Sequence, residues 1–339
     1  MSRAAWQVPD EELRPLYEAI ERFRARETWR HVPAEGPVGV QDPESGEVGY
    51  CCVMGRLKEL FGLAVYRGPD GLANYLQMSE AGPGPKALDA VLGCRMLMAS
   101  FGQREALLPG EREAIKRLGL KYRGRDAWPS FSSYLPFTVP WYLDEAEARF
   151  LTLCFQQVDE MASRSREDPA LWLTGGGDHI LVRVPTPQGW VDQWRLPELP
   201  APVGPSAVAL VGEEAARWMT LGQRKDIWEM AIGPSPAPVQ DAPGQRPYVP
   251  MVVLVVDRAT KFILDTRLCP HDHLAMAVGE TVLRCVSHIG ARPAVIRVDD
   301  PTLAGLVEPL AEQLQVSVKV VNRTSVAQAV MRELVSRFG

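Results

Sequence analysis

The sequence predicts two domains, an N-terminal α+β domain followed by a C-terminal α/β domain. The chain has 339 residues, which is enough for two hydrophobic cores. In the last third, β-branched strands alternate with amphipathic helices, as in parallel strands joined by crossovers. In the first part, hairpin signals and helices occur in separate blocks. Prolines cluster at 197–205, so we expect domains at 1–200 and 201–339.

The N-terminal elements follow from hydrophobic spacing and turn residues. The turn formers Asp42-Pro43-Glu44-Ser45-Gly46 lie between two β-rich segments and predict a hairpin. Apolar residues at helical spacing predict helices elsewhere. The expected elements are a helix at 10–26, strands at 38–41, 48–53 and 61–66, helices from 72, at 87–101 and at 145–163, and a hairpin at 180–194.

An aromatic and proline-rich stretch at 128–142 is the candidate binding surface of this domain. Its candidate residues are Trp128, Tyr134, Trp141 and Tyr142. Tyrosine and tryptophan offer rigid, amphipathic contact area to a partner. The alternative, which the usual burial of large aromatic residues favours, is a loop packed over the N-terminal core.

The C-terminal core is expected at 226–339, interrupted by a loop at 233–247 that holds five prolines. Met251–Val256 is a continuous apolar run, as in a strand buried on both faces. Gly290 is expected to end a helix. The expected elements are strands at 227–232, 251–256, 261–268, 294–298 and 316–321, and helices at 272–289, 303–314 and 325–338.

Two phrases of this domain carry a family resemblance. They are Val255–Thr260, with an Asp-x-x-Thr turn after a hydrophobic strand, and Arg292–Asp299, with an aspartate that ends a later strand. The segment 251–321 thereby resembles the ribonuclease H-like core of integrases and transposases, which implies a mixed sheet with helices on both faces. The whole chain also resembles a group of bacterial two-domain proteins of unknown function.

The resemblance to integrases implies three carboxylates that hold two Mg²⁺ or Mn²⁺ ions. Asp299 matches the second carboxylate, and Asp300 beside it is a further candidate metal ligand. Glu333 follows at nearly the family's interval, and Glu229 is the acidic residue that the strand 227–232 offers. Asp300 has a second interpretation, because an aspartate before Pro301 is typical of a helix N-cap.

The strand that should supply the first carboxylate offers only Glu229, and Asp300-Pro301 replaces the Asn-Gly that follows the second aspartate in the family. We therefore expect a non-catalytic binding or scaffold protein, with a metal-dependent nuclease or strand-transfer enzyme as the alternative. Mg²⁺ or Mn²⁺ is expected only under that alternative. The net charge of −5 favours a protein or peptide partner over nucleic acid, which requires basic surface. The N-terminus lacks a secretion signal and no apolar run reaches membrane-spanning length, so the expected location is the cytoplasm.

Overall fold

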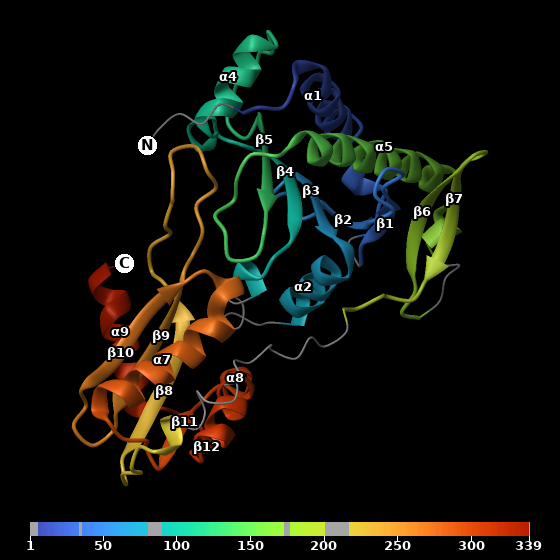
Figure 1. The fold of residues 1–339 in the computed structure, drawn as a ribbon. Coiled ribbons are helices and arrows are strands. Elements are labelled where there is room, and N and C mark those ends of the chain that lie inside the picture. Colours follow the sequence, from blue (N-terminus) through green and yellow to red (C-terminus); the bar gives the residue numbers. More distant parts are fainter. Residues whose placement is uncertain (1–5, 34–35, 81–89, 173–176, 201–216, 339) are drawn as a thin grey trace. The chain divides into compact units, whose positions relative to one another are not determined.

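The computed structural model describes residues 6–33, 36–80, 90–172, 177–200 and 217–338 (Figure 1). The chain divides into two compact units, each with its own sheet. The first unit comprises Met1–Ala201 and Asp241–Arg246, and the second comprises Pro202–Gln240 and Pro247–Gly339. Among the described residues, no helix combines the length and the apolar character that crossing a bilayer requires.

The first unit contains a seven-stranded sheet in the order β5-β4-β3-β2-β1-β6-β7. Neighbouring strands are antiparallel, except that β1 and β6 run parallel. Its strands are β1 (Val38–Gln41), β2 (Val48–Met54), β3 (Gly62–Arg67), β4 (Met96–Gly102), β5 (Trp128–Tyr134), β6 (Ile180–Thr186) and β7 (Gly189–Arg195). Its helices are α1 (Asp10–Ala25), α2 (Gly68–Glu80), α4 (Pro109–Arg117) and α5 (Glu145–Glu167), with short 3-10 turns at Thr28–Arg30, Arg104–Ala106 and Pro169–Trp172.

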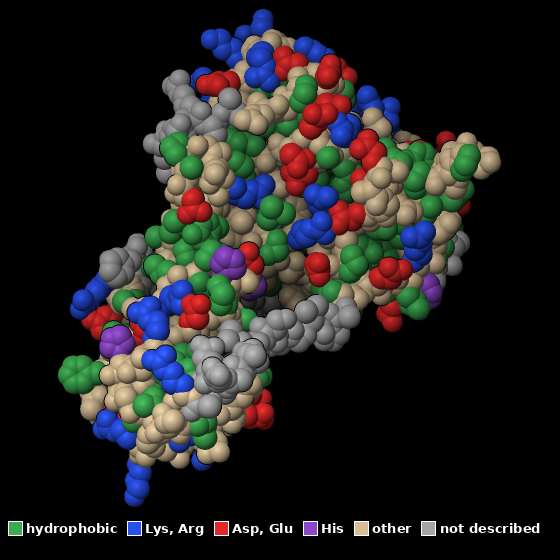
Figure 2. Space-filling view, in the orientation of Figure 1, with side chains coloured by type: hydrophobic (Ala, Val, Ile, Leu, Met, Phe, Trp, Pro, Cys, Tyr) green, Lys and Arg blue, Asp and Glu red, His purple; other side chains and the backbone are tan. Residues whose placement is uncertain are grey.

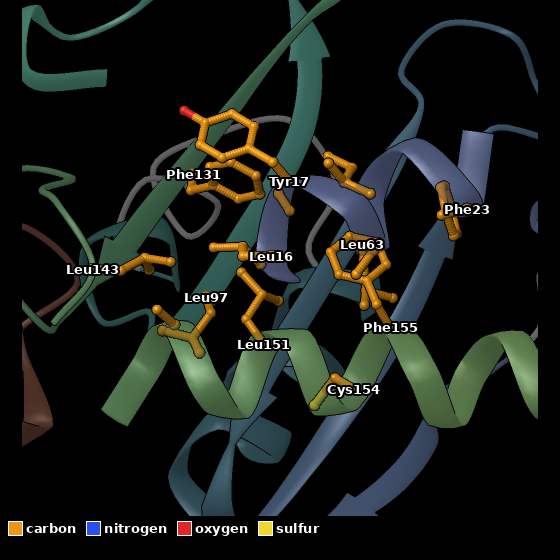
Figure 3. Close-up of a cluster of buried hydrophobic side chains, with 14 of the residues drawn as sticks. Leu16, Tyr17, Phe23, Leu63, Leu97, Phe131, Leu143, Leu151, Cys154 and Phe155 are labelled. Carbon is orange, nitrogen blue, oxygen red and sulfur yellow. The ribbon is translucent and has the colours of Figure 1, made fainter. Parts of the chain in front are cut away.

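The main core of this unit lies between the sheet and the helices α1 and α5 (Figure 3). Tyr17 of α1 meets Phe131 of β5 edge to face, with ring centroids 5.1 Å apart. From α5, Leu151 and Phe155 enter the same cluster. Burying one such side chain contributes roughly 1.5–3 kcal/mol. The other face of the sheet packs against α2 through a smaller cluster that includes Tyr66.

The predicted helix at 87–101 is wrong, because Met96–Gly102 forms the strand β4. This strand pairs with β3 on one side and with β5 on the other. Leu97 and Ala99 face the main core, while Met96 and Met98 face the smaller cluster. A segment that is apolar on both faces carries no period of its own, so strand pairing determines its structure. Residues 81–89 lie outside the described part.

The second unit contains a five-stranded sheet in the order β10-β9-β8-β11-β12. The strand β9 runs antiparallel to both of its neighbours, β10 and β8, whereas β11 runs parallel to β8 and to β12. The strands are β8 (Ile227–Pro234), β9 (Met251–Asp257), β10 (Ile263–Cys269), β11 (Val295–Val298) and β12 (Ser317–Val320). The helices are α7 (Leu274–Ile289), α8 (Pro301–Gln313) and α9 (Ser325–Phe338), with a 3-10 turn at His271–His273 before α7.

Helices cover both faces of this sheet at its centre. Every residue of β9 is buried, as predicted for a strand covered on both sides. Val252, Leu254 and Val256 pack against α9, and α7 also packs on β9 and β10. The predicted stop at Gly290 is confirmed, since this residue ends α7 in the left-handed conformation with φ of 67°.

A buried carboxylate fixes α4 to the edge strand β5 of the first unit. Glu111 is fully buried, and its Oε1 accepts hydrogen bonds from the Phe131 backbone N–H at 2.7 Å and from the Ser130 hydroxyl at 3.0 Å. Its Oε2 accepts the Leu108 backbone N–H at 2.7 Å. These bonds join the start of α4 to β5, so α4 is held at a set distance from Trp128.

Removing the hydroxyl of Tyr17 should leave stability unchanged or raise it by up to about 1 kcal/mol. This hydroxyl is buried and has no hydrogen-bond partner among the described residues, and an unpaired buried polar group destabilises the fold. We expect urea unfolding to show this for Tyr17→Phe, whereas Phe131→Ala should cost about 3–5 kcal/mol. A loss above about 1 kcal/mol in Tyr17→Phe would show that the hydroxyl has a partner.

Glu111 should make stability depend on pH in the acidic range. Burial raises the pKa of its carboxyl from 4.5 to about 6. A raised pKa stabilises the folded state at low pH, and this contribution is lost as the pH rises through about 6. Relative to Glu111→Gln, the free energy of unfolding should fall by up to about 2 kcal/mol between about pH 4.5 and pH 7. Urea titrations of both proteins measure the difference; a value independent of pH would contradict the assignment.

Candidate functional site

Glu229 lies in the interior of the second unit. It belongs to the central strand β8 and is 1% exposed. Its Oε2 accepts the backbone N–H groups of Val326 at 2.8 Å and of Ala327 at 3.2 Å, both in the first turn of α9. Its Oε1 lies 3.3 Å from Nε of Arg258. A carboxylate at a helix N-terminus satisfies free amides and interacts favourably with the helix dipole.

Asp299 accepts hydrogen bonds from the residue before α9, and it lies at the end of the neighbouring strand β11. It follows β11 directly, and the register of the parallel pair sets Glu229 beside Arg297. Asp299 is two positions beyond Arg297 and therefore on the same face of the sheet as Glu229. Its Oδ2 accepts the backbone N–H of Thr324 at 3.0 Å and the Thr324 hydroxyl at 2.7 Å. The two carboxylates thus converge on the start of α9.

Glu333 and Asp300 do not join this pair. Glu333 is exposed and forms an ion pair with Arg337 one turn further along α9. At 1.5 Å per residue, it lies about 10 Å along the helix axis from Val326. Asp300 is the N-cap of α8, where its Oδ1 accepts the Thr302 backbone N–H at 2.7 Å. Its interpretation as a helix cap is therefore confirmed.

The described residues contain no group of three or more histidine, cysteine, aspartate or glutamate side chains placed to hold a metal ion. The turn residue Asp257, which is not among the candidate metal ligands, accepts the backbone N–H and the hydroxyl of Thr260, each at 2.7 Å. Burial has the largest single effect on the Asp257 carboxyl and raises its pKa. The hydrogen bonds that Thr260 donates act in the opposite direction, and the pKa is lowered overall. The acidic residues of this region thus have local partners.

The aromatic candidates of the first unit lie in different environments. Trp128 and Tyr134 are the two ends of strand β5, so residues 128–134 form a strand and not a loop. Tyr134 packs into the cluster beside α2. Trp141 bridges back to β5 at Ser133. Tyr142 is buried in the main core, where its hydroxyl accepts the Gly110 backbone N–H at 3.0 Å.

Trp128 lines a surface groove of about 530 Å³ beside α4. The groove is lined by Arg104, Pro109, Arg112, Glu113, Ile115, Lys116, Leu120 and Trp128. Figure 2 shows lysine and arginine side chains, with aspartate and glutamate side chains among them, over the end of the first unit at which Figure 1 labels α4. The sequence pointed to Trp128 but not to the cations. Arg112 and Lys116, four residues apart in a helix, were the signal that could have found them.

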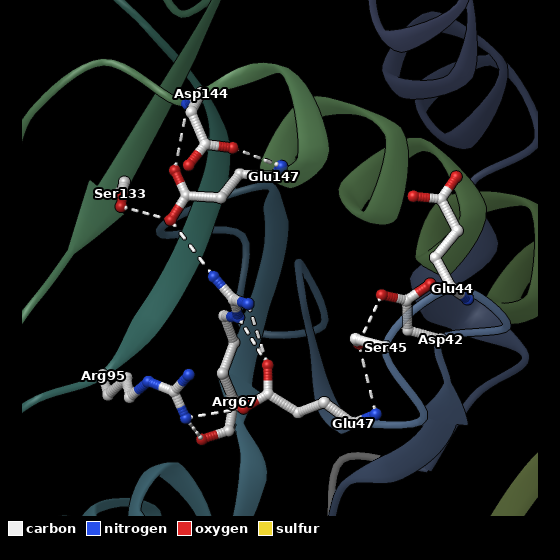
Figure 4. A network of polar contacts seen from close by, with 9 residues as sticks. All are labelled: Asp42, Glu44, Ser45, Glu47, Arg67, Arg95, Ser133, Asp144 and Glu147. Carbon is white, nitrogen blue, oxygen red and sulfur yellow. Dashed lines mark hydrogen bonds and ion pairs between the residues drawn. The ribbon is translucent and has the colours of Figure 1, made fainter.

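A chain of alternating charges elsewhere in the first unit is structural (Figure 4). Arg95 donates to Glu47 at 2.6 Å, Arg67 donates to Glu47 at 2.9 Å, and Arg67 donates to Glu147 at 3.2 Å. Glu147 also accepts the Asp144 backbone N–H at 3.1 Å, and Asp144 accepts that of Glu147 at 2.8 Å. This reciprocal cap begins α5. The network therefore joins the sheet to α5.

The hairpin at residues 42–46 adjoins this network, as Figure 4 shows. Asp42 accepts the backbone N–H of Glu44 at 3.1 Å and the hydroxyl of Ser45 at 2.6 Å. Gly46 has φ of 75°, which glycine adopts without strain. The predicted hairpin is confirmed, and its polar residues stabilise the turn.

Comparison with solved structures gives nine matching chains. One belongs to the cryoEM structure of the simian T-cell lymphotropic virus intasome in complex with PP2A regulatory subunit B56 gamma. It is 13% identical with a TM-score of 0.26, and the match covers 34% of this chain and 41% of that one. A likeness at this TM-score carries no inference. No curated protein matches the chain.

Two family models match the sequence, one in each part of the chain. Residues 214–335 match the model described as "Domain of unknown function (DUF6930)". Residues 14–183, half of the chain, match the model described as "Domain of unknown function (DUF7309)". These matches fit the expected two-domain protein, and neither description states an activity. The chain belongs to the DUF7309 family.

Proposed function

We propose that this protein is a non-catalytic binding protein whose second unit is a scaffold of ribonuclease H-like topology. The strand order supports the topology. If the five strands are numbered in chain order from β8 to β12, they lie in the sheet in the order 3-2-1-4-5. The second strand, β9, runs antiparallel to the other four. Helices pack on both faces, as the resemblance to integrase cores implies.

The observation that carries the proposal is the use of Glu229 and Asp299 as anchors of α9. A divalent ion at Glu229 would displace the hydrogen bonds from Val326 and Ala327, which are worth about 1.5–3 kcal/mol each because the acceptor is charged. The ion would also lie beside the positive charge of Arg258. The donor set therefore fits a helix N-terminus and does not fit a divalent metal.

One observation favours the alternative, a metal-dependent nuclease or strand-transfer enzyme. Glu229 and Asp299 lie on the same face of adjacent parallel strands, where two carboxylates could share an ion. Mg²⁺ or Mn²⁺ would be the cofactor under this alternative. The third candidate, Glu333, is exposed and paired with Arg337. We therefore rank this function second.

The partner in the leading proposal is a protein or peptide in the cytoplasm. The net charge of −5 disfavours binding to nucleic acid through nonspecific attraction of phosphates. All six cysteines are free thiols, which agrees with a reducing compartment. Recognition would fall to the first unit, in which Trp128 lines an open groove.

Millimolar Mn²⁺ should leave the thermal unfolding midpoint unchanged in the wild type and in Asp299→Asn. A ligand that binds only the folded state raises the midpoint, and the proposal provides no preformed metal site. Differential scanning fluorimetry with matched Ca²⁺ and EDTA samples measures this. A Mn²⁺-dependent rise that disappears in Asp299→Asn, together with cleavage of DNA, would establish the alternative.

Glu229→Gln should lower the free energy of unfolding by about 1–2 kcal/mol at neutral pH. The substitution keeps the shape of the side chain but removes the charge that interacts with the N-terminus of α9. Urea unfolding measures the loss. The matched control is Glu333→Gln, which should change stability by less than about 0.5 kcal/mol because that ion pair is exposed. Equal effects of the two substitutions would contradict the anchoring role of Glu229.

A further inference from the structure

The groove beside α4 presents more positive charge than its surroundings neutralise. Arg104, Arg112 and Lys116 line it and are exposed. None of the three forms an ion pair with any residue that the structure describes. Among the described residues that line the groove, Glu113 is the only acidic one. The cations therefore attract an anionic occupant.

The apolar residues of the lining favour an occupant that carries an apolar group as well as negative charge. Pro109, Ile115, Leu120 and Trp128 form the apolar wall of the groove. An occupant that carries an apolar side chain between its negative charges would bury this wall while its carboxylates meet the cations. A simple inorganic anion would leave the wall exposed.

The contacts of Trp128 distinguish between a peptide and a nucleic acid. The guanidinium of Arg104 lies over the ring of Trp128, 5.7 Å from its centroid. Tyr122 packs against the same ring in an edge contact, with centroids 5.8 Å apart. Stacking of a base requires an aromatic ring with an open face, and Arg104 lies over one face of Trp128. The groove thus favours carboxylates and aliphatic groups over nucleotide bases.

The groove is held in shape before any partner binds. Glu111, which precedes the groove residue Arg112, fixes α4 to β5 through its bonds to Phe131 and Leu108. Trp128 lies at the start of β5. Both walls are therefore attached to one buried carboxylate, and a preformed site loses little conformational entropy on binding.

We propose that this groove binds an acidic peptide segment with an apolar side chain among its carboxylates. The inference rests on the proposed binding function and assigns it a site and a partner chemistry. Arg112 and Lys116 of α4 bind the carboxylates of the segment, Arg104 adds charge beside Trp128, and Leu120 and Trp128 receive the apolar side chain.

Fluorescence anisotropy tests this with the full-length protein. The probe is a labelled octapeptide of glutamate and aspartate with one central leucine; the comparison probes are its Gln/Asn counterpart and an oligothymidylate of eight nucleotides. We expect the acidic peptide to bind and the two comparison probes not to bind, and we expect its affinity to fall as the salt concentration rises. The double substitution Arg112→Glu, Lys116→Glu should weaken binding by at least about tenfold.

The control is Arg125→Glu, a single charge reversal against two in the double variant, at a side chain that is 82% exposed and outside the groove lining. It should change the affinity less than about twofold. Equal losses in the control and the double variant would overturn the site, as would absence of peptide binding. Tighter binding of oligothymidylate that the double variant abolishes would reassign the groove to nucleic acid. Mn²⁺-dependent DNA cleavage would instead overturn the proposed function and leave the peptide result standing.

Discussion

A carboxylate that is removed from water must have its oxygens occupied by hydrogen-bond donors, and this requirement recurs throughout the structure. Glu229 is occupied by the first amides of α9. Glu111 is occupied by the amides of Leu108 and Phe131. Glu147 accepts from Asp144 and from Arg67. In each case the carboxylate joins a helix to a strand or to the segment before it, so the buried charges fix how helices are attached to the two sheets.

The same requirement bears on function. Adjacent carboxylates at the centre of a mixed sheet are the arrangement in which a metal site is expected. Here the backbone of residues 324–327 supplies the donors, and the nearby cation is Arg258. Glu229 and Asp299 thus hold the start of α9, and we propose the groove beside α4 in the first unit as the surface for recognition.

Local signals made much of the fold predictable. The turn at Asp42–Gly46, the cap at Asp300 and the stop at Gly290 depend on residues close in sequence, and the structure contains all three. Met96–Gly102 was not predictable, because its two apolar faces suit a helix as well as a strand, and its partners in β3 and β5 decided the outcome.

The candidate site was less predictable for a related reason. Glu229 and Asp299 were identified by residue type, but the partner of Glu229 lies 97 residues away. No local pattern reports a contact at that separation. The groove likewise joins Arg104 and α4, which are close in sequence, to Trp128, which the pairing of β4 with β5 brings beside them.

Hydrogen exchange of the first turn of α9 tests most directly whether Glu229 anchors this helix. The account predicts that Glu229→Gln speeds exchange of the amides of Val326 and Ala327, whereas exchange in α8, which supplies none of the hydrogen bonds or ion pairs described for Glu229, stays at its wild-type rate. Mn²⁺ should alter neither rate. Unchanged protection at Val326 and Ala327 in the variant would contradict the account, most decisively if Mn²⁺ slowed exchange around Glu229 and Asp299 in the wild type.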